Sequence, residues 1–294
     1  MYVILTENKT ESVLMVVGLG THDGPVQDVY HISLERPDRV RMIGETPAHV
    51  RYAAAVEVID NTLYAVGIGL AFNELWKWNA ASDWTRCADM TSCRRWHCVA
   101  AVDSTLYALG GWVDADSTTL SSVEAYNTQA NKWSAAGPLT HAVRLAACVS
   151  YNDSIYVFGG MNATGKPVNH VQVYNTAQNN CTLLQPAMPR AYAWMRAVVW
   201  KTYAVLLGPD TCFIYNFETE TWQERKLFRT RVHEFGLVLD KKTLFIAGGS
   251  LPPTEEVLSV SVRDVIADKQ GSRWTYHATL PTPAALYAFG LVLL

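Results

Sequence analysis

The stretch TLYALGGWVDAD, Thr105–Asp116, decides how the fold of this 294-residue chain is interpreted. Residues that favour β-strands run into two adjacent glycines, and a tryptophan follows directly. Variants of its centre recur as LMVVGLG (Leu14–Gly20), LYAVGIG (Leu63–Gly69), IYVFGGM (Ile155–Met161), YAVLLGP (Tyr203–Pro209) and LFIAGGS (Leu244–Ser250). Corresponding positions lie 41 to 49 residues apart, and self-similarity at this period is typical of a propeller or another repeat array.

Each unit is predicted to contain four short strands. The first, such as RYAAAVEVI from Arg51, ends in a two-residue Asn/Asp turn such as Asp60-Asn61, and the glycine-pair strand returns. The third strand ends in an aromatic residue and Asn, as at Lys77–Asn79, Ala125–Asn127, Val173–Asn175 and Ile214–Asn216. The fourth carries Trp84, Trp133 or Trp222, with Cys181 in the fourth unit and Trp274 after a longer insertion in the sixth. We expect these repeated aromatic residues to pack between units. Short strands at this spacing leave no room for a helix of useful length, so the predicted fold is all-β.

The two ends of the chain predict how the repeats close. The chain starts at a second strand, Ser12–Gly18, and ends on LYAFGLVLL, Leu286–Leu294, which aligns with the first strand that begins at Arg51. Pairing the tail with the opening strand would remove two exposed sheet edges. We therefore expect one domain over residues 1–294, a six-bladed propeller with four antiparallel strands per blade, cut from the C-terminal part of a longer protein. A β-sandwich or an open stack of sheets is the alternative, but sandwiches do not repeat their sequence at this period.

Composition limits the partners and the compartment. The net charge of −3 supplies no general positive field for nucleic acid or a membrane surface. No apolar run approaches the roughly 20 residues that cross a bilayer, and the first residues lack the pattern of a signal peptide. We expect a protein of the cytoplasm or nucleus, with its six cysteines as reduced thiols.

The glycine pair, the Tyr-Asn element and the trailing Trp together resemble the Kelch repeat over essentially the whole chain. Units one, two and five depart from the pattern, with Gly18-Leu19, Gly67-Ile68 and Leu207-Gly208 at the pair. The chain looks most like the C-terminal domain of BTB–Kelch proteins. That resemblance implies a monomeric propeller that recruits a protein substrate, joined to upstream BTB and BACK domains that dimerise and hold a cullin–RING ubiquitin ligase.

Strand direction predicts a single binding surface. The loops between blades and the loops after the glycine pairs should open on the same face, where the resembled family binds substrate peptides. The partner-binding candidates are Arg51, Tyr52, Arg94, Arg95, Trp96, Trp112, Arg144, Met161, Asn162, Tyr192, Asp210, His233 and Tyr287. Arg, Trp and Tyr dominate interface hot spots, and clustered arginines favour an acidic peptide through bidentate pairing. For any one of these arginines the alternative is a structural ion pair with a neighbouring blade.

Catalysis, metal binding and cofactor binding are not predicted. Cys87, Cys93 and Cys98 lie near His97, but their spacing does not match a zinc knuckle. No nucleophile elbow, phosphate loop or zinc-protease motif is present. A sugar-processing enzyme would need two facing carboxylates, for which Asp210 and Glu234 are the candidates near the axis. An actin-binding or scaffold Kelch module, binding through its outer surfaces, is the other alternative.

Overall fold

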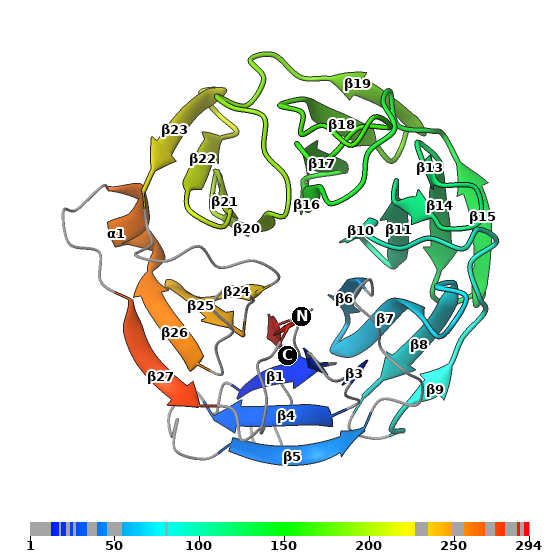
Figure 1. Ribbon diagram of the computed structural model, residues 1–294, viewed down its shortest axis with the longest axis horizontal. Helices are drawn as coiled ribbons and strands as arrows, with labels where there is room; N and C mark the ends of the chain where they lie inside the picture. The colour runs from blue at the N-terminus through cyan, green and yellow to red at the C-terminus, as the bar shows by residue number, and fades with distance from the viewer. Residues whose placement is uncertain are drawn as a thin grey trace.

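The structure is a computed structural model, and it describes residues 13–17, 19–21, 24–25, 28–33, 40–45, 55–79, 82–226, 235–248, 256–267, 274–279, 287–288 and 291–293. Within these ranges, six four-stranded antiparallel sheets stand around a central axis as the blades of a disc (Figure 1). The predicted all-β, six-bladed propeller is confirmed. Its repeating unit is the one that the sequence period predicts.

From the axis outward, the blades consist of the following strands. Blade 1 contains β29 (Leu291–Leu293), β1 (Val13–Val17), β4 (Asp28–Ser33) and β5 (Val40–Glu45). Blade 2 contains β6 (Ala55–Ile59), β7 (Thr62–Ile68), β8 (Glu74–Trp78) and β9 (Thr85–Arg86). Blade 3 contains β10 (Cys98–Val102), β11 (Thr105–Leu109), β14 (Val123–Asn127) and β15 (Lys132–Ala136). Blade 4 contains β16 (Ala147–Tyr151), β17 (Ser154–Phe158), β18 (Val171–Asn175) and β19 (Asn180–Leu183). Blade 5 contains β20 (Arg196–Trp200), β21 (Tyr203–Leu207), β22 (Cys212–Asn216) and β23 (Thr221–Arg225). Blade 6 contains β24 (Gly236–Asp240), β25 (Thr243–Ala247), β26 (Glu256–Ser261) and β27 (Thr275–Thr279).

Blade 1 is assembled from both ends of the chain. β29 pairs antiparallel with β1, with Leu14 opposite Leu293 and Val16 opposite Leu291. β29 also lies beside β24 of blade 6, so the tail completes the first sheet at the junction with the last one. The predicted closure is therefore confirmed, and it removes the exposed edge that β1 would otherwise present.

The turns between the first and second strands explain why Asn, Asp and Gly recur there. Asp60 and Asn61 join β6 to β7 with φ of 48° and 56°, a left-handed conformation that Asn and Asp tolerate better than most residues. In blade 3, the glycine pair that follows β11, Gly110 and Gly111, has φ of 63° and 110°. A Cβ on Gly110 would lie 2.4 Å from the carbonyl oxygen of Val143, which belongs to the loop leading into blade 4. The first glycine therefore permits close contact with the next blade.

The hydrophobic core lies between the blades. One cluster joins Val66 of blade 2 to Val99 and Leu106 of blade 3. A second cluster joins Leu109 of blade 3 to Ile155 of blade 4. Successive residues of a strand point to opposite faces, so each blade contributes to the core on both sides, as the alternating apolar residues require.

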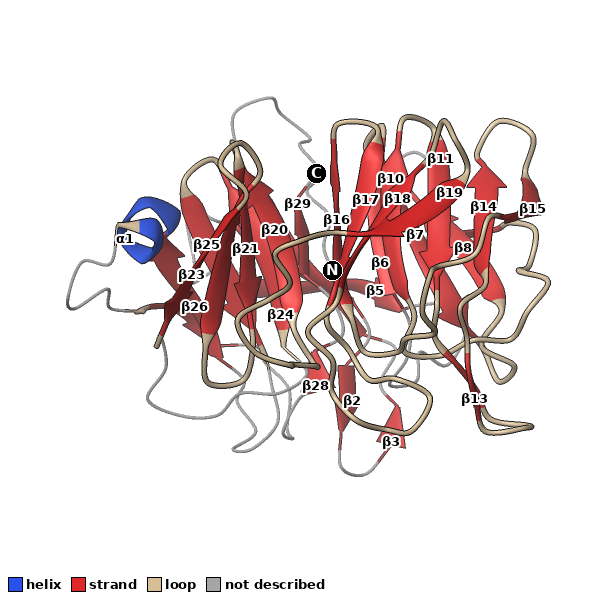
Figure 2. Ribbon diagram, turned by 90° about the horizontal axis from the view of Figure 1, so that it is seen from above, coloured by secondary structure: helices blue, strands red, loops and turns tan. Residues whose placement is uncertain are grey.

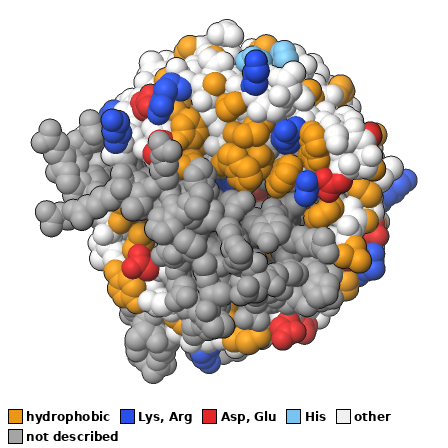
Figure 3. All heavy atoms as spheres, in the orientation of Figure 1, with side chains coloured by type: hydrophobic (Ala, Val, Ile, Leu, Met, Phe, Trp, Pro, Cys, Tyr) orange, Lys and Arg blue, Asp and Glu red, His pale blue; other side chains and the backbone are white. Residues whose placement is uncertain are grey.

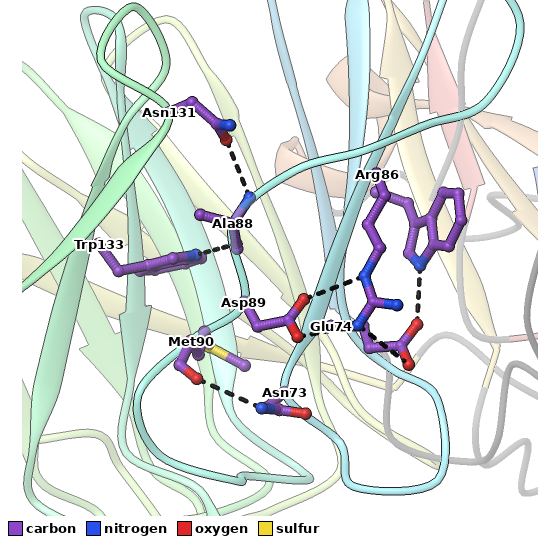
Figure 4. A network of polar contacts seen from close by, with 9 residues as sticks. Asn73, Glu74, Arg86, Ala88, Asp89, Met90, Asn131 and Trp133 are labelled. Atoms are coloured by element: carbon purple, nitrogen blue, oxygen red, sulfur yellow. Dashed lines mark hydrogen bonds and ion pairs between the residues drawn. The ribbon is translucent and has the colours of Figure 1, made fainter.

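Side-chain hydrogen bonds link neighbouring blades near their outer strands. Asn131 accepts hydrogen bonds from the hydroxyl of Tyr126 at 2.8 Å and from the backbone N–H of Ala88 at 2.9 Å. The indole N–H of Trp133 donates to the carbonyl of the same Ala88 at 2.8 Å (Figure 4). The aromatic residues of the third and fourth strands thus hold the chain that leaves blade 2. The predicted packing role of Trp133 and Tyr126 is confirmed.

The next blade repeats this arrangement. Asn179 accepts from the hydroxyl of Tyr174 at 2.6 Å and from the backbone N–H of Gly137 at 2.7 Å. Asn131 and Asn179 have φ of 48° and 53°, so the fifth residue after the Tyr turns left-handed in both units. Asn127 and Asn175 accept hydrogen bonds from backbone N–H groups of the turns that follow them and so cap these turns.

Two features add to the predicted pattern. The insertion in blade 6 forms a short helix, α1 (Val262–Ile266), which buries Val262 and Val265 against the blade, so the expectation that the unit has no room for a helix holds only for the regular units. Short strands also project beyond the sheets: β2 (Leu19–Thr21), β3 (Gly24–Pro25) and β28 (Tyr287–Ala288) form one small sheet, and β12 (Trp112–Val113) and β13 (Thr118–Thr119) form another. In the described part of the chain, no helix is long and apolar enough to cross a bilayer.

Candidate peptide-binding surface

The two predicted sets of loops meet at one end of the blades. Arg95, before blade 3, pairs with Trp112, after its glycine pair, through backbone hydrogen bonds of 3.0 and 2.7 Å. Arg144 and Met161 form the same pair in blade 4, at 3.0 and 2.7 Å. Figure 2 shows β2, β3, β13 and β28 beyond this same end of the sheets. Residues from loops of different blades are therefore brought to one face.

Three loops between blades are linked directly to one another around the axis. The backbone N–H of Leu145 donates to the carbonyl of Trp96 at 2.9 Å, and that of Trp194 donates to the carbonyl of Leu145 at 3.1 Å. All three have left-handed backbones, with φ of 55° at Trp96, 56° at Leu145 and 62° at Trp194. Such a conformation costs a non-glycine residue on the order of 1–3 kcal/mol, and strain of this kind gathers at functional sites. We call Trp96, Leu145 and Trp194 the inner row.

Arg95 is already paired within its own chain. Its guanidinium lies 2.6 Å from a carboxylate oxygen of Asp114 and 4.0 Å from the ring centre of Trp96. The ring of Phe72, from blade 2, lies 5.9 Å away. Asp114 also accepts a hydrogen bond from the indole N–H of Trp112 at 3.0 Å. One carboxylate thus fixes both the cation and the tryptophan.

Arg144 has a different environment. Its guanidinium lies 4.1 Å from the ring centre of Trp112 and donates to the hydroxyl of Thr119 at 2.5 Å. Within the described residues, no carboxylate forms an ion pair with it. Burial and repulsion by the charge of Arg95 both lower the pKa of Arg144 from its usual value. No negative charge of the described residues therefore balances that of Arg144, which suits a carboxylate supplied by a partner.

These side chains form a mixed aromatic and cationic surface. Trp96 lies 6.5 Å from Trp112 and 6.4 Å from Trp194 between ring centres. Figure 3 shows one face of the disc, on which hydrophobic side chains gather among Lys and Arg side chains. We call Arg95, Trp96, Trp112 and Arg144 the Arg–Trp surface. All four were candidates from the sequence, and the structure brings them together.

Arg94 does not belong to this surface, and placing it among the partner-binding residues was wrong. Its side chain is fully buried, with one guanidinium nitrogen 2.9 Å from the carbonyl of Gly110 and the other 2.7 Å from a carboxylate oxygen of Glu124. Burial would raise the pKa of Glu124, but the backbone N–H of Thr91 and then the Arg94 charge lower it overall. Arg94 is therefore a structural residue of blade 3.

Tyr192 occupies, in the loop before blade 5, the position that Arg94 occupies in the loop before blade 3. This position is one residue earlier than that of Arg144 in the loop before blade 4. Gly160 donates to the carbonyl of Tyr192 as Gly111 does to that of Val143, and the residue after Tyr192 is the buried Ala193. The Tyr192 hydroxyl donates to Asp210, and burial, followed by that hydrogen bond, raises the pKa of Tyr192 to about 12. Tyr192 and Asp210 thus satisfy each other.

The remaining candidates are divided between described and undescribed residues. Asn162 accepts from the backbone N–H groups of Thr164 and Lys166, both at 3.0 Å, and so shapes its own loop. Arg51, Tyr52 and His233 lie outside the described residues. Only the backbone of Tyr287 is described, where it pairs with Gly20.

Sequence reasoning missed Trp194 and Asp114. The signal for Trp194 is its spacing, because Trp96, Leu145 and Trp194 are each 49 residues apart and have the same backbone conformation. Asp114 has no signal in the repeat, since it belongs to a loop that varies between units. Its role follows only from its contacts with Arg95 and Trp112.

Within the described residues, no group of three or more His, Cys, Asp or Glu is arranged to hold a metal ion. All six cysteines are described, and each is a free thiol. Cys98 is buried in the core between blades 3 and 4.

His97, beside this surface, gives the folded domain a predictable response to acid. Burial, and then the charge of Arg94, lower the pKa of His97 from 6.5 to about 3. Between those values the unfolded chain binds a proton that the folded chain does not, so stability falls as the pH falls below about 6.5. From neutral pH to pH 5 this residue should account for a loss of about 2 kcal/mol in the free energy of unfolding.

Urea denaturation at pH 7.5 and pH 5.0 measures this effect. The free energy of unfolding of His97→Leu should fall by about 2 kcal/mol less between the two pH values than that of the unmodified chain. Equal acid sensitivity of the His97 variant and the unmodified chain would show that His97 titrates normally in the folded state.

A protein-family model described as the KLHDC2/KLHL20/DRC7 Kelch-repeats domain matches residues 96–270. Among curated proteins, the chain is 26% identical to Kelch-like protein 35 of Mus musculus over 86% of its own length and 44% of that protein. It is 26% identical to Kelch-like protein 23 of Homo sapiens over 70% of its length and 38% of that protein. The chain thus spans less than half the length of these relatives.

The chain is also similar to a curated protein that is not a Kelch-like protein by name, and to a solved structure. The chain is 25% identical to alpha-scruin of Limulus polyphemus over 83% of its length and 30% of that protein. The solved structure of YjhT aligns with a TM-score of 0.62 at 16% identity, over 78% of this chain and 81% of that one. The second similarity concerns the propeller fold alone.

Proposed function

The chain belongs to the Kelch-repeat family, and from this premise we propose that its propeller binds a peptide segment of a partner protein at the Arg–Trp surface. The observation that carries the proposal is Arg144, a half-buried cation over the face of Trp112 without a carboxylate partner among the described residues. Half-buried tryptophans and arginines are the residues that most often dominate binding energy at protein interfaces.

The test is loss of a partner on charge reversal. Arg144→Glu should lower the affinity for the captured partner at least tenfold, because a hydrogen bond between charged groups is worth about 1.5–3 kcal/mol and the new carboxylate would repel the ligand. Proteins captured from a lysate on the unmodified chain and on this variant would be compared by mass spectrometry, and the affinity for a purified partner measured by calorimetry.

Lys201→Glu is the matched control. Lys201 is exposed in the turn between β20 and β21, at the opposite end of the blade, so its reversal changes the net charge equally without touching the Arg–Trp surface. Thermal unfolding of both variants should stay close to that of the unmodified chain. Equal capture by the two variants would place the binding surface elsewhere.

Within this proposal, the finer role is substrate recruitment to a cullin–RING ubiquitin ligase through upstream BTB and BACK domains, in a dimeric protein of the cytoplasm or nucleus. Support comes from the matches to Kelch-like proteins, of which this chain spans less than half. We propose no catalytic role. Of the two candidate carboxylates, Asp210 accepts a hydrogen bond from the hydroxyl of Tyr192, and Glu234 lies outside the described residues.

A scaffold or actin-binding module is the second candidate. It is supported by the similarity to alpha-scruin, which extends over most of the chain. Binding of that kind would use the outer strands. It therefore predicts that partner capture is unchanged in Arg144→Glu, which separates the two candidates in the same experiment.

A further inference from the structure

The inner row lies directly beside Arg144, which has no carboxylate partner among the described residues. Leu145 follows Arg144 in the chain, and its backbone bonds to Trp96 on one side and to Trp194 on the other. The side chains of all three row residues are only half-buried. Large aromatic side chains that remain half-exposed at a strained backbone position are suited to burial against a ligand. The row therefore offers an apolar contact next to Arg144.

The charges at this surface favour a ligand with one acidic group over a ligand with two. Arg95 already has Asp114 at 2.6 Å, whereas the partners of Arg144 among the described residues are the hydroxyl of Thr119 and the face of Trp112. A second carboxylate brought near Arg95 would meet the negative charge of Asp114, which like-charge repulsion disfavours. The ligand is thus expected to carry a single carboxylate at this place.

A single-stranded nucleic acid would also supply negative charge and rings that stack on tryptophan. It is disfavoured because a run of phosphates needs several free cations, and Asp114 and the exposed Asp116 add negative charge beside Trp112. A peptide can place one carboxylate beside one apolar side chain without further charge.

We propose that the Arg–Trp surface and the inner row together bind an extended peptide in which one Asp or Glu is followed or preceded, within a few residues, by one large apolar side chain. The carboxylate pairs with Arg144, and the apolar side chain packs on Trp96, Leu145 and Trp194. This proposal rests on the proposed function and goes further by stating the class of peptide.

The experiment is selection of a displayed library of random dodecapeptides on the folded domain. The unmodified chain should enrich peptides that combine an acidic and a large apolar residue at fixed spacing. Arg144→Gln should lose the acidic preference and Trp194→Ala the apolar one. Each variant should bind the best peptide of the unmodified chain at least tenfold more weakly. Trp200→Ala, which changes a half-buried tryptophan beside the turn that holds Lys201, is the control and should keep both preferences.

A third variant tests the single-acid requirement. Asp114→Asn keeps an oxygen that can accept the indole N–H of Trp112 but removes the charge that pairs with Arg95. The selected peptides should then carry a second acidic residue. An unchanged selection would show that Arg95 is out of the ligand's reach and would overturn the single-acid argument.

The outcomes separate this proposal from the proposed function. Enriched peptides that lack either the acid or the apolar residue, or that bind Trp194→Ala as tightly as the unmodified chain, would overturn the inference and leave peptide binding intact. No enrichment on a domain shown to be folded by its thermal unfolding would overturn peptide binding itself. Tighter binding of a twelve-nucleotide oligothymidylate than of any selected peptide would assign the surface to nucleic acid.

Discussion

Arg94→Met is expected to lower the free energy of unfolding by about 3–5 kcal/mol, because it leaves the carboxylate of Glu124 buried without its cation. The Arg94 guanidinium also donates to the carbonyls of Gly110 and Ser122 at 2.9 and 3.0 Å, and both acceptors would lose these hydrogen bonds. Its side chain is fully buried and that of Glu124 is 5% exposed, so water cannot replace the lost partner without entering the blade. Urea denaturation measures the loss.

The double variant Arg94→Met, Glu124→Gln is the control. It removes both charges, so it should be more stable than Arg94→Met alone, although Gln cannot reproduce every hydrogen bond that Glu124 accepts from Thr91 and Ser92. Peptide binding at the Arg–Trp surface should be retained in any variant that still folds. A single variant that loses less than about 1 kcal/mol would mean that the pair contributes little to stability.

Gly110→Ala should also destabilise the propeller strongly, by about 3 kcal/mol or more. The new Cβ would lie 2.4 Å from the carbonyl oxygen of Val143, and at φ of 63° an alanine is strained as well. The obstacle is backbone, so relief requires blades 3 and 4 to move apart and lose part of the core between them. The midpoint of urea denaturation measures this effect.

Gly44→Ala provides the matched comparison. Gly44 lies in β5, and a Cβ there would meet nothing within 4 Å, so the same substitution should change the free energy of unfolding by well under 1 kcal/mol. Similar midpoints for the two variants would show that the Gly110 position has room that the structure does not show.

The fold could be predicted because its determinants recur at one period. The glycine pair permits the close approach of Gly110 to Val143. Asn131 and Asn179, each five residues after a Tyr whose hydroxyl bonds to it, link neighbouring blades in the same way. A determinant that is repeated in the fold is repeated in the sequence. The helix α1 escaped prediction for the opposite reason, since it lies in an insertion that no other unit shares.

The site was less predictable because adjacent residues of one type have opposite roles. Arg94 and Arg95 are neighbours in the chain, yet one is buried on Glu124 and the other pairs at the surface with Asp114. Which arginine turns inward depends on a carboxylate 30 residues away and on the left-handed turn at Trp96. Pattern alone cannot separate the two, because both partners come from outside the motif.

The pairing of β29 with β1 has a consequence for biosynthesis. As the chain leaves the ribosome, the strand Val13–Val17 emerges before the strands of blades 2 to 6, and its partner Leu291–Leu293 emerges after them. During that interval β1 has an unpaired edge, with which another extended polypeptide in the cell could form backbone hydrogen bonds. Newly made molecules should therefore depend on chaperones far more than folded molecules, in which β29 is paired with β1.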